Sequence, residues 1–228
     1  MRHIVGLGGG GETDEQTWRL DAYALALTGK EQPRILFVPT ALADSAYSAS
    51  EVVRFYERYG AHGTLSHLLT FPWPPENLRE LVLEQDAIYV SGGNTANLLA
   101  LWRVHGIDAL MREAWERGVV LFGASAGMIC WFEAGVTDSF GPQLEGLRDG
   151  LGFLPGSACP HYDGEDRRRP RYRELVQDGF PAGIAADDGV ALRFAGTELE
   201  EVVTCRPGAA AYRVSADGEE AIEARLLG

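Results

Sequence analysis

A serine flanked by glycines is the first candidate for chemistry in this chain. Residues 123–127 read Gly-Ala-Ser-Ala-Gly, which matches the pattern G-x-S-x-G around Ser125. The apolar, β-branched residues 118–122 are typical of a strand buried in a parallel sheet, and residues 126–132 read as the buried start of a helix. A serine at such a strand-to-helix turn is in the setting of a nucleophile elbow. An ordinary tight turn that needs small residues explains the same sequence. Whether Ser125 is a nucleophile therefore depends on whether the chain also supplies a base and an acid.

A serine nucleophile needs a base, and the base needs an acid that orients it. The chain has five histidines, which are His3, His62, His67, His105 and His161. The first four fall in or beside expected strands and helices, where core or surface roles are ordinary. His161 lies in "ACPHYDGED", between an apolar stretch and a charged loop, and is the best-placed base, although a single histidine is often structural.

Two places in the chain offer the acid. Asp138 lies in "GVTDSFG", after the expected elbow helix. Asp187 and Asp188 lie in "GIAADDGVAL", between two apolar segments that favour partial burial of the pair. An exposed pair of acids in a solvated turn fits the same letters, so both places stay candidates.

A glycine pair marks a second possible part of the site. Residues 89–99, "YVSGGNTANLL", indicate a strand, then Gly92 and Gly93, then Asn94 as the N-cap of a helix. Backbone N–H groups at such a turn can face an oxyanion, and the carboxyl ends of strands collect sites in open α/β sheets. The alternative is a capped helix start without chemistry.

A longer glycine run near the N-terminus is a weaker signal. In "GLGGGGE", Gly6, Gly8 and Gly11 match the dinucleotide pattern G-x-G-x-x-G, but the acidic residue expected after the second strand is missing. We interpret the run as a turn that packs close to the edge of the active site. The chain also lacks a Walker lysine and any Cys/His cluster with zinc spacing, so we expect neither a cofactor nor a metal.

Strand-like and helical segments alternate along most of the chain. The pattern predicts strands at 2–8, 34–41, 63–71, 86–93 and 118–122, and helices that include 12–29, 48–60, 94–106 and 107–118. This alternation predicts an α/β fold with a doubly wound, mostly parallel sheet flanked by helices. Beyond residue 183, the segments 189–196, 198–205 and 209–218 predict short antiparallel C-terminal strands that extend the same sheet. We expect a single domain over residues 1–228.

Composition limits the possible partners. The formal charge of −13 argues against nucleic acid and against an anionic membrane, because both need a basic face. No apolar run approaches the roughly 20 residues that span a bilayer. The N-terminal residues indicate a strand rather than a signal peptide, and Cys130, Cys159 and Cys205 form no C-x-x-C pair, so we expect a reduced, cytoplasmic protein. A homodimer is compatible with the sequence, which does not define the oligomeric state.

Four blocks in this order resemble one family of enzymes. "GGNTANLL", "GASAGMICW", "CPHYDGED" and "IAADDGVAL" together are similar to the peptidase E (α-aspartyl dipeptidase) family of serine peptidases. That family is related to cyanophycinase and has the class I glutamine amidotransferase-like fold. The resemblance extends from the first strand to about residue 192, and "RILFVPTA" fits the second strand of the family.

The resemblance implies a role for each candidate. It makes Ser125 the nucleophile and His161 the base, and it assigns the oxyanion hole to the N–H groups of Gly93 and Ala126. The acid falls on Asp188, which precedes a glycine, with Asp138 as the second choice. The family usually has a glutamate at the first position, so an aspartate there must reach the histidine with a shorter arm.

The segment after His161 departs from the family. The family has a longer loop that selects an N-terminal aspartate, whereas here "HYDGEDRRRPRYREL" runs quickly into a helix that begins near Pro170. Arg167, Arg168 and Arg169, with Asn94, are the candidate substrate-binding residues, since guanidinium groups bind carboxylates. A solvated charged loop is the slightly favoured alternative, although basic residues oppose the dipole at a helix N-terminus.

The resulting prediction is a serine peptidase of the dipeptidase or aminopeptidase type that acts on short peptides. A preference for aspartyl substrates is in doubt because the loop is short. One alternative is a non-catalytic binding protein on the same scaffold. The other is an esterase or amidase without a preference for peptides.

Overall fold

A computed structural model describes residues 1–43 and 46–228, without the side chains of 46–48. The predicted helical segments 12–29, 48–60, 94–106 and 107–118 each contain or overlap a helix of the structure. The helices are α1 (Asp14–Ala26), the 3₁₀ helix η1 (Thr40–Leu42), α2 (Ala46–Tyr59), α3 (Leu78–Leu83), α4 (Thr95–His105), α5 (Ile107–Glu116), α6 (Ala126–Ile129) and α7 (Arg168–Gln177).

The first of two sheets has eight strands in the described residues, in the spatial order β14-β11-β10-β1-β5-β4-β2-β3. In that order they span Arg225–Leu226, Glu198–Thr204, Val190–Ala195, His3–Leu7, Val120–Ala124, Ala87–Val90, Arg34–Val38 and Thr64–His67. Each pair of neighbours in the series β1-β5-β4-β2-β3 is parallel. Strand β10 pairs antiparallel with β1, and β11 pairs antiparallel with β10. The predicted mostly parallel sheet with antiparallel C-terminal strands is confirmed.

The second sheet is a feature that the sequence did not predict. Its order in the described residues is β13-β12-β9-β8-β6-β7. In that order the strands span Gly218–Ile222, Ala211–Ser215, Gly183–Ala186, Leu154–Cys159, Phe132–Thr137 and Glu145–Leu147. The expectation that residues 209–218 extend the first sheet is therefore wrong, because β12 pairs with β9 and β13.

The helix after Ser125 is shorter than expected, because residues 130–132 pair with a neighbouring loop. The carbonyl of Cys130 accepts the N–H of Leu151, and the carbonyl of Trp131 accepts the N–H groups of Phe153 and Leu154. Helix α6 accordingly ends at Ile129, and residues 132–137 form a strand of the second sheet.

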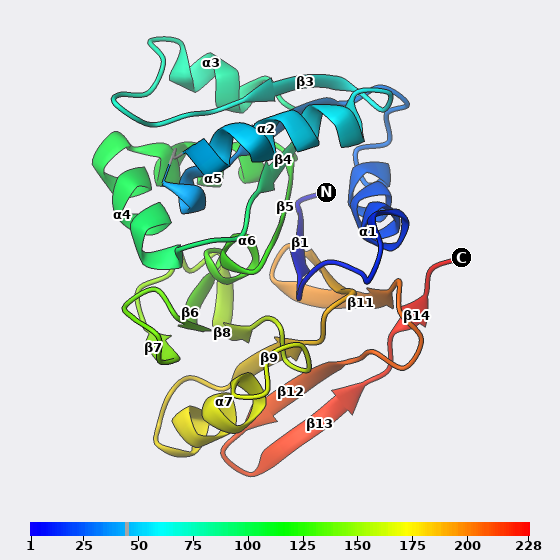
Figure 1. Cartoon of the computed structure of the whole chain (residues 1–228), viewed down its shortest axis with the longest axis vertical. Helices are drawn as coiled ribbons and strands as arrows, with labels where there is room; N and C mark the ends of the chain where they lie inside the picture. Colours follow the sequence, from blue (N-terminus) through cyan, green and yellow to red (C-terminus); the bar gives the residue numbers. More distant parts are fainter. Residues whose placement is uncertain (44–45) are drawn as a thin grey trace.

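The first sheet separates two layers of helices (Figure 1). Alternate residues of a strand point to opposite faces. Ile4 of β1 packs in the cluster that includes α4 and α5, whereas Val5 packs in the cluster that includes α1 and α2. The first of these clusters also contains Ala158 and Ala211 of the second sheet. The two sheets therefore share one hydrophobic core.

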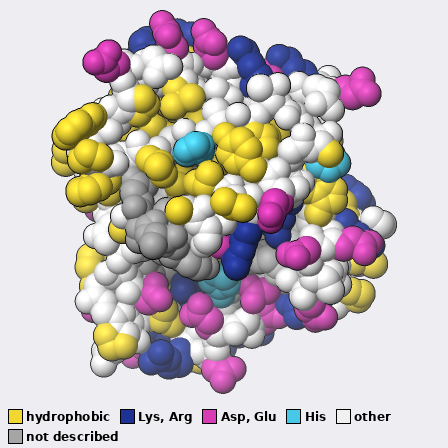
Figure 2. All heavy atoms as spheres, turned by 45° about the horizontal axis from the view of Figure 1, so that its top comes forward, with side chains coloured by type: hydrophobic (Ala, Val, Ile, Leu, Met, Phe, Trp, Pro, Cys, Tyr) yellow, Lys and Arg dark blue, Asp and Glu magenta, His cyan; other side chains and the backbone are white. Residues whose placement is uncertain are grey.

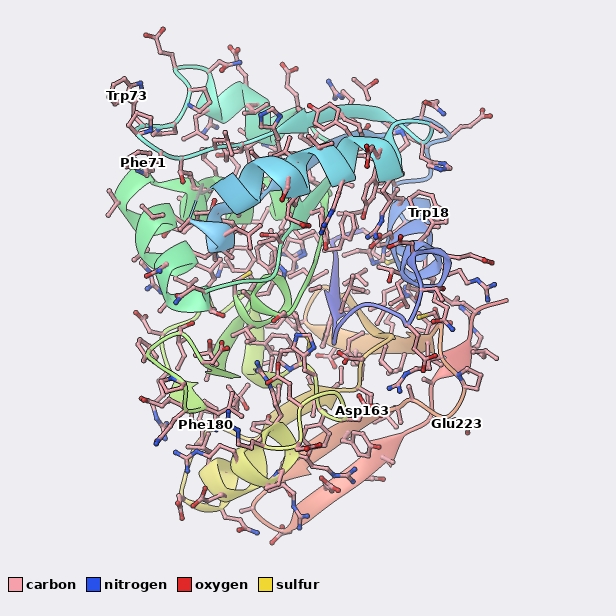
Figure 3. All side chains as sticks on the ribbon, in the orientation of Figure 1. Trp18, Phe71, Trp73, Asp163, Phe180 and Glu223 are labelled. Atoms are coloured by element: carbon pink, nitrogen blue, oxygen red, sulfur yellow. The ribbon has the colours of Figure 1, made fainter. Side chains whose placement is uncertain are left out.

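Apolar side chains gather on part of the surface. Figure 2 shows them in the middle and on the left of one face, with acidic and basic side chains below. Phe71 and Trp73 project from the connection between β3 and α3 and are each 75% exposed (Figure 3). Among the helices of the described residues, none combines the length and the apolar composition needed to cross a membrane.

Candidate active site

Ser125 lies at a strained turn between β5 and α6. Its φ of 56° and ψ of −112° fall in a region that residues with a side chain rarely adopt. The two flanking glycines are required by packing, because a methyl group on Gly123 or Gly127 would overlap the carbonyl oxygen of Val90 at the end of β4. Backbone strain between two such glycines resembles the geometry of a nucleophile elbow.

His161 is paired with a carboxylate. Its Nδ1 atom lies 2.6 Å from Oδ1 of Asp188, and the side chains are 24% and 32% exposed. A carboxylate at Nδ1 selects the tautomer that carries its hydrogen there, so Nε2 is left as a proton acceptor. In the described part of the chain, Nε2 has no hydrogen-bond partner of its own. This is the arrangement that a general base needs.

The glycine run after β1 holds the serine, the histidine and the acidic turn together. Three successive carbonyl oxygens at the end of β1 accept N–H groups from these elements: Leu7 from Ser125 (3.2 Å), Gly8 from His161 (2.9 Å) and Gly9 from Gly189 (3.4 Å). Residues that are far apart in the sequence therefore meet at one short stretch of backbone. His161 also has a positive φ of 54°, so His161, like Ser125, is held in an unusual backbone conformation.

Glycines also line the acidic residue. A methyl group on Gly9 would overlap the carboxylate of Asp188, and a methyl group on Gly164 would overlap the same carboxylate. The space beside Gly8 is also occupied by protein, because a side chain there would overlap the backbone oxygens of Ala186 and Asp187. The glycine run therefore forms a turn that packs against residues of the candidate site.

The turn after β4 lies beside the serine. A Cβ atom on Gly92 would be 3.3 Å from the Cβ of Ser125. Gly93 has a φ of 134°, and its N–H group, like that of Ala126, donates to no other residue that the structure describes. Both groups are free to bind an oxyanion, which is the role that the resemblance implied for them.

Asn94 has a structural role in this turn. Its Oδ1 atom accepts the N–H of Asn97 at 2.8 Å, so Asn94 is the predicted N-cap of α4. Its Nδ2 atom donates to the carbonyl of Ser139 at 2.9 Å. With both ends of the amide occupied by protein, its predicted part in substrate binding has no contact to support it.

The other two acidic candidates form no hydrogen bond or ion pair with the imidazole. Asp138 is exposed and follows β6 rather than a helix, and no hydrogen bond or ion pair joins it to His161. Asp187 is 3% exposed, and its Oδ2 atom accepts the N–H of Ala210 at 3.0 Å. Burial raises the pKa of Asp187. Of the three acids, only Asp188 contacts the histidine.

The three arginines after His161 all contact other residues of the protein. The slightly favoured interpretation of a solvated loop is wrong for Arg168 and Arg169. Arg168 is 3% exposed and bonds Glu165 and the carbonyl of Val136. Arg169 pairs with Glu219 and stacks on two tyrosine rings, Tyr162 and Tyr212. Arg167 is exposed, donates to the carbonyl of Pro142 at 3.3 Å and lines a cavity of about 510 Å³. No hydrogen bond or ion pair joins any of the three to Ser125, His161 or Asp188.

Two residues that the sequence did not single out contact the acidic turn. Asp163, which follows His161 by two positions, accepts the N–H of Asp188 through Oδ1 at 2.9 Å. Arg206 donates from Nε to the carbonyl of Asp188 at 3.2 Å and forms an ion pair with Asp163. The proximity of Asp163 to His161 in the sequence was a signal for the first. Nothing in the sequence around Arg206 distinguishes it from an ordinary loop residue.

The site residues do not form an evident metal centre. Among the residues that the structure describes, no three His, Cys, Asp or Glu side chains are grouped to hold a metal ion. The three cysteines are buried and free. The chemistry that this arrangement can perform with its own groups is acyl transfer through a serine.

Comparison with known proteins identifies a family and two similar chains. The model of peptidase family S51 matches residues 4–202. The chain is 49% identical to "Uncharacterized peptidase YgaJ" of Bacillus subtilis (strain 168), over 99% of this chain and 97% of that protein. It is 30% identical to "Peptidase E" of Shewanella denitrificans, over 56% of this chain and 58% of that protein.

Solved structures share the fold. A peptidase from an acI-B1 Actinobacterium superposes with a TM-score of 0.74 and 19% identity, over 98% of this chain and 95% of that chain. A putative peptidase E protein from Listeria monocytogenes EGD-e superposes with a TM-score of 0.64 and 19% identity, over 90% and 98% of the respective chains.

Proposed function

The chain belongs to peptidase family S51, and we propose that it hydrolyses short peptides as a dipeptidase or aminopeptidase, through Ser125, His161 and Asp188. The observation that carries this proposal is the 2.6 Å hydrogen bond between His161 and Asp188, held on the same strand end as the strained Ser125. A nucleophile, a base and an orienting acid are the groups that a serine peptidase requires. The family assignment favours this activity over a binding protein without catalysis.

The proposed reaction proceeds through an acyl-enzyme. Nε2 of His161 accepts the proton of Ser125 as Oγ attacks the peptide carbonyl carbon. The N–H groups of Gly93 and Ala126 stabilise the negative charge on the carbonyl oxygen. His161 then donates its proton to the leaving amine as the C–N bond breaks, and water hydrolyses the ester by the same steps in reverse. Asp188 holds the imidazole in the required tautomer and stabilises its charged form.

We propose a broad rather than strictly aspartyl specificity. An aspartyl substrate would need a basic group that is free to bind its side chain. Arg168 and Arg169 already pair with Glu165 and Glu219. Arg167 is the most exposed of the three, and its guanidinium contacts a carbonyl across the chain at Pro142. These contacts support a substrate site that does not depend on the arginine cluster.

A screen of short peptides with free and blocked N-termini tests this function. We expect hydrolysis of several dipeptides and tripeptides with a free amino group, and little hydrolysis of peptides with an acetylated N-terminus. p-Nitrophenyl esters serve as the comparison. If only simple esters are hydrolysed, the protein is an esterase on this scaffold and the proposed substrate class is wrong.

A further inference from the structure

We propose that Asp163 and Arg206 are positioning residues that hold Asp188 in place for its bond to His161, an inference that rests on the proposed function. Both polar groups of the Asp188 backbone are bound by this one ion pair. Asp163 accepts the N–H of Asp188 at 2.9 Å, and Arg206 donates to the carbonyl at 3.2 Å. Arg206 and Asp163 then bind each other, which closes a ring around the acidic residue.

The ring connects three segments of the chain. Asp163 belongs to the loop that carries His161, and Figure 3 shows it between β1 and the second sheet. Arg206 belongs to the loop after β11, which is anchored to the acidic turn because the carbonyl of Gly189 accepts the N–H of Cys205 and the hydroxyl of Thr204, both at 2.9 Å. The ring therefore ties the loop of the base to the turn of the acid.

This ion pair differs from an ordinary surface pair. Surface pairs contribute little to stability because solvent screens them and their long side chains must be ordered. Here the side chains of Arg206 and Asp163 are 25% and 33% exposed, and the hydrogen bond to Asp163 raises the pKa of the Arg206 guanidinium. An aspartate has one methylene between backbone and carboxylate. The position of its backbone therefore largely determines where the carboxylate lies.

Replacing either partner is expected to lower turnover more than substrate binding. For Asp163→Ala and Arg206→Ala we expect kcat to fall about 10- to 100-fold, by analogy with residues that orient the ligands of metal sites. KM should change little, because neither residue is proposed to contact substrate. The double variant should lose little more than the worse single variant, since both changes open the same ring.

Two further variants separate positioning from general destabilisation. Asp163→Asn keeps an oxygen that accepts the N–H of Asp188, so it should retain more turnover than Asp163→Ala. Arg103→Gln is the control, because Arg103 of α4 forms an ion pair at 2.7 Å with Asp149, which lies after β7 and is 81% exposed. The variant should leave kcat unchanged, since it removes an ion pair that does not contact the acidic turn.

A spectroscopic readout makes the test independent of peptidase activity. The proton shared by His161 Nδ1 and Asp188 should give a low-field NMR signal in the wild-type protein, which broadens or disappears in Asp163→Ala and Arg206→Ala. An unchanged signal together with unchanged kcat in folded variants would overturn the proposal and leave the peptidase function intact. If the wild-type protein hydrolyses no peptide, the proposed function fails, and the NMR signal of the variants still decides whether the pair positions Asp188.

Discussion

Gly9 packs directly against the carboxylate of Asp188, so the end of β1 forms one wall of the site for the acidic residue. The opposite contact comes from Gly164, three residues after His161. A carboxylate between two glycines has little freedom to move. The glycine run near the N-terminus is thus part of the proposed catalytic geometry, although it carries no reactive side chain.

The variant Gly9→Ala should therefore inactivate the enzyme. Its methyl group would overlap the Asp188 carboxylate and lie 2.9 Å from Nδ1 of His161. A displacement of about 1 Å in a catalytic group can cost about 100-fold in rate. Gly10→Ala is the matched control, because its methyl group would meet only Thr17, at 3.1 Å. Comparison of kcat for the two variants checks the prediction, and equal losses would contradict it.

The choice among the acids gives a second prediction. Asp188→Asn should reduce kcat by up to about 10⁴-fold, because an amide no longer selects the correct histidine tautomer. Asp138→Asn should leave kcat near the wild-type value, because Asp138 is exposed and has no contact with His161. Steady-state kinetics of both purified variants decide the matter. A larger loss for Asp138→Asn would make that residue the acid of the triad.

The sequence was sufficient for the parts of the fold that follow from local patterns. The parallel strands and their helices were predicted because apolar runs alternate with capped helices, and Asn94 was recognised as a cap from its position. Residues 126–132 were read as the start of a helix, but α6 ends at Ile129 and a strand begins at Phe132, because apolar residues suit either structure. The second sheet was missed because its central strands pair with strands that lie far away along the chain, as β8 does with β9 and β9 with β12.

The sequence likewise predicted only part of the site. Ser125, His161 and Asp188 could be named from four short blocks, but their meeting point could not. The backbone carbonyls of Leu7, Gly8 and Gly9 determine where these segments meet. Every residue has such a carbonyl, so the sequence does not show which ones accept these hydrogen bonds. Arg206 was missed because its partners lie 18 and 43 positions away along the chain.

Stability should depend on pH through a buried acid outside the site. Asp21 in α1 is 1% exposed, and burial raises its pKa from 3.8 to about 7, despite Arg58 at 3.6 Å. Because its pKa is higher in the folded than in the unfolded state, the folded state binds the extra proton. Its contribution to the free energy of unfolding is present at low pH and is lost as the pH rises towards and through about 7.

The variant Asp21→Asn tests this directly, because asparagine does not titrate. A difference of about 3 pH units between the two pKa values corresponds to about 4 kcal/mol over the full range. The stability of Asp21→Asn relative to wild type should therefore rise with pH. Urea unfolding of both proteins at about pH 5 and about pH 8 measures the difference. If it is the same at both values, Asp21 does not titrate in this range.

Substrate specificity should depend little on Arg167. Arg167→Ala should reduce kcat/KM for Asp-X and Leu-X dipeptides by similar small factors, because Arg167 has no contact with the proposed catalytic residues. If it binds substrate carboxylates instead, the loss should fall on Asp-X peptides and should weaken with salt, since charges are screened over about 8–10 Å at physiological ionic strength. Hydrolysis of Asp-X peptides alone would show a strict aspartyl dipeptidase.

Identification of the residue that reacts with a serine-directed fluorophosphonate is the most direct measurement of the central claim. The wild-type protein should be labelled on Ser125, as located by mass spectrometry of the digested protein, and lose its peptidase activity in proportion. Ser125→Ala should be folded, unlabelled and inactive, because it removes one oxygen and keeps the glycines that shape the turn. Labelling of Ser125→Ala at the wild-type level, or peptide hydrolysis that survives the substitution, would contradict the assignment of Ser125 as the nucleophile.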